Sequence, residues 1–238
     1  MSAARRYVTP PDNVIQAPVR WLSGRVARLL LHTPITPNLI TVARALINAA
    51  ALGCFVQGSY RFFVYGFLLF QFFELLDNVD GDLARLRGMT SRVGALMETF
   101  QDAYGAQPSN LFGLCVALGM VRQGGGLVPL YLYAATAIGR LLWLEYRGPF
   151  GWAADKAAVL GGEHGHYMPL NSVSNAGVII YKWQNQFILW GGLLRPLEPR
   201  LLLWSLGFVA VLNHLPWLIV VAKGFRRARM VSKEPDRR

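Results

Sequence analysis

The amino-acid sequence predicts an all-α integral membrane protein, with six transmembrane helices and an amphipathic interfacial helix before them. Hydrophobic residues make up 53% of the 238 residues and charged residues only 16%, whereas a soluble domain carries about 25% charged residues. Apolar stretches that are long enough to cross a bilayer as a helix, about 20 residues, recur along the chain. These two observations favour a membrane protein over a soluble domain.

Residues 1–38 are expected to form a juxtamembrane segment that contains the amphipathic helix, near Pro18–Leu31. Proline suits the first turn of a helix, where its missing N–H is not needed. Apolar residues then recur at three- and four-residue steps, at Val19, Leu22, Val26 and Leu29, with Leu30 on the same side. The arginines of this segment point elsewhere, which is typical of a helix that lies in the interface plane. Packing of this helix against the bundle is the alternative that the sequence leaves open.

Residues 39–222 are expected to form the six-span domain, and residues 223–238 a basic cytosolic tail. The predicted spans lie near Leu39–Val56, Arg61–Leu86, Ser91–Val121, Leu127–Leu144, Ser172–Gly192 and Leu201–Ala222. The second and third spans are long because polar motifs occupy their ends. The fifth has the weakest apolar pattern, since polar side chains interrupt it at Lys182, Gln184, Asn185 and Gln186.

The distribution of basic residues predicts the orientation. Of the 24 Lys and Arg residues, few fall in or beside the loops on one side of the predicted bundle: Arg61, Arg122, Arg195 and Arg200. Because cytosolic loops carry the excess of Lys and Arg, we expect a multi-pass protein with both termini at the cytosolic face. Attraction to anionic membrane lipids explains the net charge of +11. Nucleic-acid binding is not expected, because the basic residues flank spans rather than forming a patch interleaved with aromatic residues.

Five carboxylates lie within the apolar sequence between Asp77 and Asp102. Ionisable groups at membrane depth are costly, so such a cluster is a functional site by default. Asp77 and Asp80 are three residues apart, and Glu98 and Asp102 four apart, so each pair shares one helix face. A turn over Gly88–Arg92 would bring the two pairs together across antiparallel helices. Four converging acids would repel unless a divalent cation lay between them, and oxygen ligands favour Mg²⁺, with Mn²⁺ or Ca²⁺ as substitutes.

The spacing of these residues resembles the signature of the CDP-alcohol phosphotransferase (CDP-alcohol phosphatidyltransferase) family, D-x2-D-G-x2-A-R-x8-G-x3-D-x3-D. The chain matches this signature at Asp77, Asp80, Gly81, Ala84, Arg85, Gly94 and Asp102. It departs at the third acid, where Glu98 replaces Asp. The string Pro37-Asn38-Leu39-Ile40-Thr41-x2-Arg44 is similar to the start of the first transmembrane helix in that family.

The resemblance implies transfer of a phosphoalcohol group from a CDP-linked lipid, usually CDP-diacylglycerol, to the hydroxyl of a small polar alcohol, with release of CMP. Asp77, Asp80 and Glu98 would be ligands of two Mg²⁺ or Mn²⁺ ions, which pyrophosphate chemistry needs for charge neutralisation. Asp102 would be the general base that takes the alcohol proton, and also a ligand. A homodimer is implied as well. Small residues of the third and fourth spans would permit either a dimer or close packing within one protomer.

Other residues are candidates for binding. Gly81, Ala84 and Gly94 would let a nucleotide approach the helix backbones, and Arg85 would pair with a phosphate or orient a ligand carboxylate. Asn38 and Thr41 could contact the nucleotide, and the alternative is simple helix capping by Thr36 and Asn38. Candidate acceptor-binding residues, which could instead only set the topology, are Arg92, Arg140 and Arg147. Asp82 matches no fixed position of the signature and is expected to be a solvated acid at the helix end.

Three alternatives remain open from the sequence. Glu98 reaches further than Asp by one methylene, and metal sites tolerate misplacement of only about 0.5 Å, so an impaired homologue is one alternative. An aspartate-rich prenyltransferase would need two separate acidic motifs, and a transporter or channel would leave Gly81-x2-Ala84-Arg85 unexplained. The acceptor alcohol is not determined. Arg92 resembles an arginine of the family branch that transfers to inositol phosphate, which favours a phosphorylated polyol.

Overall fold

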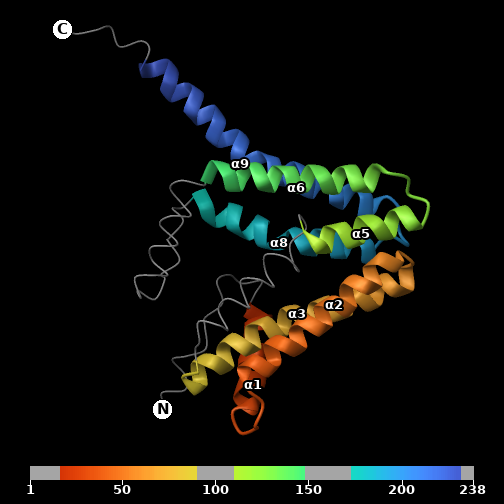
Figure 1. Cartoon of the computed structure of the whole chain (residues 1–238), viewed down its shortest axis with the longest axis vertical. Helices are drawn as coiled ribbons and strands as arrows, with labels where there is room; N and C mark the ends of the chain where they lie inside the picture. The colour runs from red at the N-terminus through yellow and green to blue at the C-terminus, as the bar shows by residue number, and fades with distance from the viewer. Residues whose placement is uncertain (1–16, 90–109, 148–172, 232–238) are drawn as a thin grey trace, which may run out of the picture. The chain divides into compact units, whose positions relative to one another are not determined.

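The computed structural model describes residues 17–89, 110–147 and 173–231, and these residues form helices and turns without any strand (Figure 1). The helices are α1 (Ala17–Leu30), α2 (Pro37–Gln57), α3 (Tyr60–Arg87), α5 (Leu111–Arg122), α6 (Val128–Arg147), α8 (Val173–Leu193) and α9 (Leu201–Val231). The chain divides into two units, Met1–Gly124 and Gly125–Arg238. The predicted all-α class is confirmed for the described residues.

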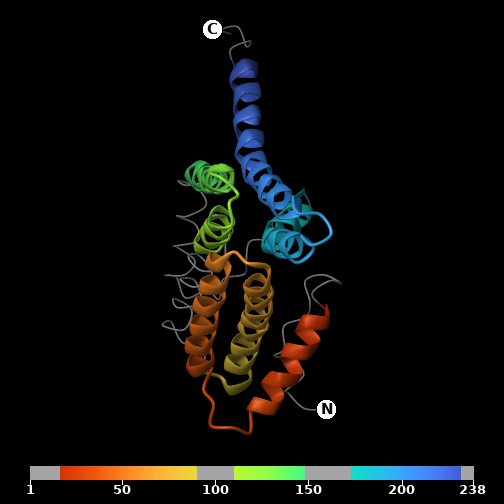
Figure 2. The ribbon, with the colours of Figure 1, turned by 90° about the vertical axis from the view of Figure 1, so that its right-hand side faces the viewer.

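In the first unit, α3 packs along both α2 and α1, and α5 packs on α2. Figure 2 shows α2 and α3 as an antiparallel pair. Thr36 caps α2, because its side-chain oxygen accepts a hydrogen bond of 3.3 Å from the backbone N–H of Leu39. Gly58 ends α2 in the left-handed region at φ 73°, which glycine adopts without strain, and α3 starts two residues later. This two-residue connection sets the register of α2 against α3.

The helices follow the predicted spans closely, with two differences. Of the third predicted span, only Leu111–Arg122 lies within the described residues. At the C-terminus, α9 continues as a helix to Val231, so the segment predicted as a tail from residue 223 is helical over its first part. By length and composition, α2 and α3 are candidate membrane spans, and the described apolar parts of α5, α6 and α9 are shorter.

Helix α1 packs through small side chains and leaves large apolar ones exposed. Ser23 and Ala27 are fully buried, and Val26 and Leu30 pack onto a cluster that α1 shares with α2 and α3. The exposed side chains are Val19, Trp21, Leu22 and Leu29. The predicted apolar face is therefore split between the core and the surface, so that α1 both packs on the bundle and keeps an apolar stripe open.

In the second unit, α9 packs against both α6 and α8. A Cβ added at Gly139 of α6 would lie 3.0 Å from the backbone of Asn213 in α9, so these helices approach closely. Asn213 also donates a hydrogen bond of 3.0 Å to the side-chain oxygen of Gln184 in α8, and both side chains are buried. The polar residue that weakened the fifth predicted span thus forms part of a helix–helix contact.

Candidate active site

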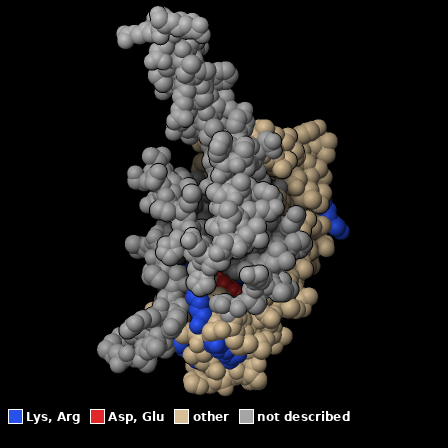
Figure 3. Space-filling model, turned by 60° about the vertical axis from the view of Figure 1, so that its left-hand side comes forward, with Lys and Arg blue, Asp and Glu red and all other residues tan. Residues whose placement is uncertain are grey.

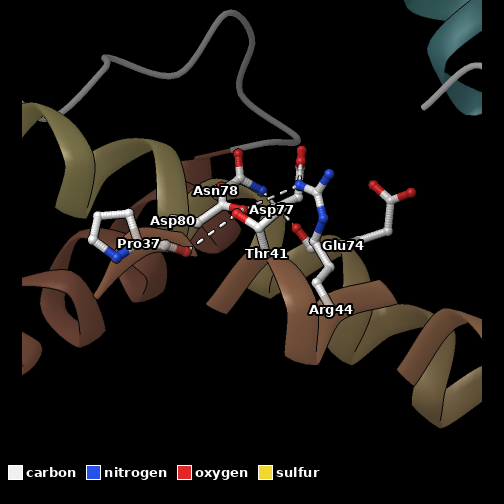
Figure 4. Close-up of polar contacts among 7 residues, drawn as sticks. All are labelled: Pro37, Thr41, Arg44, Glu74, Asp77, Asn78 and Asp80. Carbon is white, nitrogen blue, oxygen red and sulfur yellow. Dashed lines mark hydrogen bonds and ion pairs between the residues drawn. The ribbon is translucent and has the colours of Figure 1, made fainter. Parts of the chain in front are cut away.

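The first two acids of the motif lie at the packed face between α2 and α3, near the start of α2 (Figure 4). Asp77 and Asp80 are one helical turn apart on α3, and Thr41 and Arg44 are one turn apart on α2. Residues three positions apart lie on the same side of a helix, so each helix presents two polar side chains to the other. The predicted pairing of Asp77 with Asp80 on one helix face is what these contacts show.

Arg44 lies against both carboxylates. Its Nη1 forms an ion pair with Asp77 Oδ1 and lies 3.6 Å from Asp80 Oδ2. The Arg44 side chain is 0% exposed and that of Asp80 is 9% exposed, whereas Asp77 is more open. The guanidinium carbon also lies 5.3 Å from the centre of the Phe73 ring. A positive charge is thereby held in a largely apolar environment beside the two motif acids.

Thr41 contacts the other side of Asp80. Its hydroxyl oxygen lies 3.1 Å from Asp80 Oδ2 and also 3.1 Å from the carbonyl oxygen of Pro37, one turn earlier. The single hydroxyl proton is shared between these two acceptors. Asp80 is therefore oriented from α2 by both a hydroxyl and a guanidinium group.

Asp82 is not the solvated acid that the sequence predicted. Its side chain is 0% exposed, and Arg85 Nη2 forms an ion pair with Asp82 Oδ1 at 2.6 Å. The hydroxyl of Ser23 in α1 lies 3.5 Å from Asp82 Oδ2. The expectation is wrong because Asp82, two residues from Asp80, faces another packed side of α3, the side that α1 covers, rather than solvent.

The guanidinium group of Arg85 lies over the small motif residue Gly81. A Cβ at Gly81 would lie 3.4 Å and 3.5 Å from the two terminal nitrogens of Arg85, so the guanidinium group folds back over the glycine. Arg85 remains 39% exposed despite its ion pair with Asp82. The close approach of a nucleotide to Gly81 stays a prediction. The structure shows in addition that Gly81 lies next to Arg85.

Two arginines that contact the motif acids or the loop before α2 were not among the site residues predicted from the sequence. Arg44 was part of the Pro37–Arg44 string, and its spacing of three from Thr41 was the available signal. Arg87 donates hydrogen bonds of 2.5 to 2.6 Å to the carbonyl oxygens of Ile35, Leu30 and Thr33. It thereby fixes the loop that leads into α2 and carries the Thr36 cap.

The other candidates are distributed as follows. Asn38 is exposed in the first turn of α2, Ala84 is half-buried on α3, and Arg140 is half-buried on α6 in the second unit. Outside the described residues lie Arg92, Gly94, Glu98 and Asp102, and the side chain of Arg147. The structure thus brings together Asp77, Asp80 and Thr41, and adds Arg44.

The described acids fit part of a divalent-cation site. Among residues 17–89, 110–147 and 173–231, no group of three or more His, Cys, Asp and Glu side chains could hold a metal ion. Asp77 and Asp80 nevertheless offer carboxylate oxygens from one helix face, which is the donor type that Mg²⁺ and Mn²⁺ prefer. On the face shown in Figure 3, a small acidic patch is visible among the described residues, with basic surface beside it. Asp77 and Asp80 are thus two of the four predicted ligands, and their oxygen atoms suit a hard cation.

Comparison with known proteins identifies the family. Residues 34–163, more than half of the chain, match the family model described as CDP-alcohol phosphatidyltransferase. The chain belongs to this family. The predicted resemblance is confirmed, and membership supports transferase activity in membrane phospholipid biosynthesis.

A solved structure shares the fold. The crystal structure of Mycobacterium tuberculosis phosphatidylinositol phosphate synthase (PgsA1) with CDP-DAG bound aligns with a TM-score of 0.59 and 18% sequence identity. The alignment covers 91% of this chain and 96% of that chain. A search among curated proteins found no significant match. At this low identity, the likeness to PgsA1 describes the fold alone.

Proposed function

We propose that this protein transfers a phosphatidyl, or related phosphoalcohol, group from a CDP-linked lipid to the hydroxyl of a small polar alcohol, with release of CMP. CDP-diacylglycerol is the proposed donor. The observation that carries this proposal is the placement of the family acids Asp77 and Asp80 on one face of α3, where Thr41 and Arg44 of α2 contact them. PgsA1, with a similar fold, was crystallised with CDP-DAG bound, which supports the choice of donor.

The proposed reaction is a substitution at phosphorus. The acceptor oxygen forms a new bond to the phosphorus that carries the lipid, the bond from that phosphorus to the CMP oxygen breaks, and the alcohol proton goes to Asp102. Asp77, Asp80, Glu98 and Asp102 would hold two Mg²⁺ or Mn²⁺ ions, which when bound neutralise the pyrophosphate charge. A carboxylate is a weak base for an alcohol, so positioning of the acceptor is part of the proposal.

The remaining residues would bind substrates. For the donor, we assign Asn38, Thr41, Gly81, Ala84, Arg85 and Gly94. Thr41 is the best supported of these, because it already contacts Asp80. For the acceptor, a phosphorylated polyol suits the arginines proposed to bind it, Arg92, Arg140 and Arg147, since guanidinium groups pair well with phosphate.

We also propose a six-span membrane protein with both termini and the acids at the cytosolic face, on the charge asymmetry of the loops. The exposed apolar stripe of α1 supports an interfacial position for that helix. Cysteine labelling of Ser59→Cys, after replacement of Cys54 and Cys115 by alanine, tests the orientation. Ser59 suits this test better than Gly58, whose positive φ and contact with Gly119 leave no room for a side chain. Labelling from the cytosolic side alone would contradict the proposed topology.

A homodimer remains a proposal. Gly113, a small residue of the third predicted span, is already buried within a single chain. Ala134, by contrast, is exposed on α6. A concentration series in detergent, measured by light scattering, tests the dimer, and a monomer with normal turnover would contradict it.

The decisive experiment measures CMP release in proteoliposomes. The purified protein is supplied with CDP-diacylglycerol and a panel of radiolabelled alcohols, including inositol phosphate, glycerol phosphate, inositol and serine. We expect CMP release with one of these acceptors, its loss on chelation, and its return with Mg²⁺ or Mn²⁺. Absence of CMP release with every acceptor would favour an impaired homologue or a transporter.

Asp102→Asn separates the roles of the acids. We expect this variant to bind CDP-diacylglycerol within a few-fold of the wild type, and to turn over about 10² to 10⁴ times more slowly, as for loss of a general base. A variant that fails to bind the donor would assign Asp102 as a ligand instead.

A further inference from the structure

We propose that Arg44 is a positioning residue that serves as the protein's own counter-cation for the Asp77–Asp80 pair, and that it thereby tunes the affinity of these acids for a divalent cation. Only the second part of this inference, the effect on metal affinity, rests on the proposed function. The first part, the ion pairing of Arg44, requires no metal or substrate. Arg44 lies outside the acidic signature, on the neighbouring helix, at the end of the string that resembles the start of the family's first transmembrane helix.

Three observations support a structural cation at this position. Arg44 is 0% exposed, and a single terminal nitrogen, Nη1, reaches one carboxylate oxygen of Asp77 and one of Asp80. Its guanidinium carbon lies 5.3 Å from the centre of the Phe73 ring, an arrangement that favours a cation over the ring face. Thr41 lies one turn before Arg44 and contacts the same oxygen of Asp80 that faces Nη1.

The physical reason is the repulsion between two acids one turn apart. Asp77 and Asp80 share a helix face inside an apolar pair of helices, where a second negative charge is poorly solvated. Arginine suits this position better than lysine, since its planar fork is weakly hydrated and remains charged on burial. Arg44 therefore offsets the repulsion between the two carboxylates and orients them before any substrate arrives.

The same charge has the opposite effect on metal binding. A divalent cation bound by Asp77 and Asp80 would lie close to the guanidinium group, and like charges repel more strongly in a low-dielectric environment. Arg44 therefore preorganises the two acids and at the same time weakens their attraction for the metal. This balance predicts that removal of Arg44 lowers the stability of the protein and raises its affinity for the metal.

A double-mutant cycle on the metal-free protein tests the pairing. Thermal unfolding in detergent with chelator is measured for the wild type, Arg44→Met, the pair Asp77→Asn with Asp80→Asn, and the triple variant. We expect Arg44→Met to lower Tm by several degrees, and its effect to fall by at least half when both acids are already neutral, because contacting residues are not additive. Equal losses in both backgrounds would mean that Arg44 only packs on Phe73, and would overturn the proposal.

Two further variants sharpen the cycle. Arg44→Lys keeps the charge without the planar fork, so it should recover part of the lost Tm. Arg61→Met makes the same substitution at an exposed residue in the first turn of α3, and should leave Tm nearly unchanged. If Arg44→Met does not fold, Arg44→Lys and Arg44→Gln take its place in the same cycle. Greater loss with Lys than with Gln would contradict a role for the charge.

Mn²⁺ titration followed by electron paramagnetic resonance tests the second half of the proposal. Arg44→Met, or Arg44→Gln in its place, should bind Mn²⁺ about tenfold more tightly than the wild type, since a neighbouring positive charge is gone. Unchanged or weaker binding would overturn this half. If the wild type neither binds Mn²⁺ nor releases CMP, the proposed function fails and the metal half fails with it, whereas the metal-free cycle still decides the ion pairing.

Discussion

The two ends of the α2–α3 pair are packed by opposite kinds of side chain. Near the start of α2, the interface holds Arg44 and Asp80 with little exposure, and Asp77, which is more open. Near the Gly58 turn, it is filled by aromatic rings whose centroids lie 4.9 to 6.5 Å apart, those of Phe55, Phe63, Phe70, Phe73 and Phe112. Phe73 belongs to both ends, since its ring contacts Phe70 at 5.5 Å and faces Arg44.

This difference suggests that the two ends of the α2–α3 pair have different roles, one in stability and one in chemistry. Tight packing of rings and small residues holds helices together where lipid offers no hydrophobic gain. Buried ions contribute little net stability, because loss of their hydration offsets much of their attraction. We infer that the aromatic end holds α2, α3 and α5 together, and that this rigidity supports a charged end which is retained for its chemistry.

The largest effect is expected at the charged end. Asp80→Asn keeps the size of the side chain and its contact with Thr41 but removes a negative charge that the proposed metal site needs. We expect CMP release to fall about 100-fold or more, in line with loss of a ligand or its support, while Tm shifts by a few degrees only. Asp77→Asn should behave in the same way. Normal CMP release by either variant would contradict the proposed ligand assignment.

The aromatic end should show the reverse response. Phe70 is 0% exposed, and Phe70→Ala should lower the free energy of unfolding by about 3–5 kcal/mol, the usual cost of removing a packed phenyl ring. CMP release per folded molecule should stay near that of the wild type. Phe72→Ala is the matched control, because Phe72 is 48% exposed on the same helix. Similar losses of stability at both positions would remove the distinction between core and surface rings.

A smaller effect is expected where α2 meets α5. A Cβ at Gly119 would lie 2.1 Å from the carbonyl oxygen of Phe55, so Gly119→Ala must push the two helices apart. We expect a loss of about 1–3 kcal/mol in unfolding free energy, typical of overpacking. Gly53→Ala provides the control, since nothing lies within 4 Å of its added methyl group. That substitution should stabilise α2 by up to about 1 kcal/mol, and a loss at Gly53 as large as at Gly119 would refute the close-approach argument.

The sequence predicted features that depend on neighbours within one helix, and it missed features that depend on contacts between helices. The helical class, the limits of α2 and α3 and the shared face of Asp77 and Asp80 depend on neighbours within four residues, and local spacing was sufficient to predict them. The partners of Arg44 and Asp82 depend on how one helix is placed against another. The Gly58 turn and the docking of α1 set these placements, and residue spacing within one helix carries no such information.

Arg87 illustrates the same distinction. It lies in the last turn of α3, where a positive charge is favourable near the helix end, and no contact with another helix follows from that position. In the structure it binds carbonyl oxygens more than fifty residues earlier in the chain. Only the return of α3 alongside α1 and the start of α2 creates this contact.

The smallest expected effect concerns Asp82, the buried acid outside the α2–α3 face. Asp82 uses one carboxylate oxygen for Arg85 and the other for Ser23, so Asp82→Asn keeps only one of these acceptors and loses the ion pair; Arg85 can turn toward solvent because it is 39% exposed. We expect the free energy of unfolding to fall by about 1 kcal/mol, within the range of one hydrogen bond. Relative to the wild type, hydrogen exchange should become faster in α1 and change less in α2. Ser23→Ala removes the 3.5 Å contact with Asp82 and a local hydrogen bond of 3.1 Å to the carbonyl oxygen of Arg20, and it should change exchange less because the Asp82–Arg85 ion pair remains. If exchange in α1 stays at the wild-type rate even in Asp82→Ala, then the apolar packing of α1 and the Arg87 contacts hold this helix without the buried pair, which matters only for the orientation of Arg85.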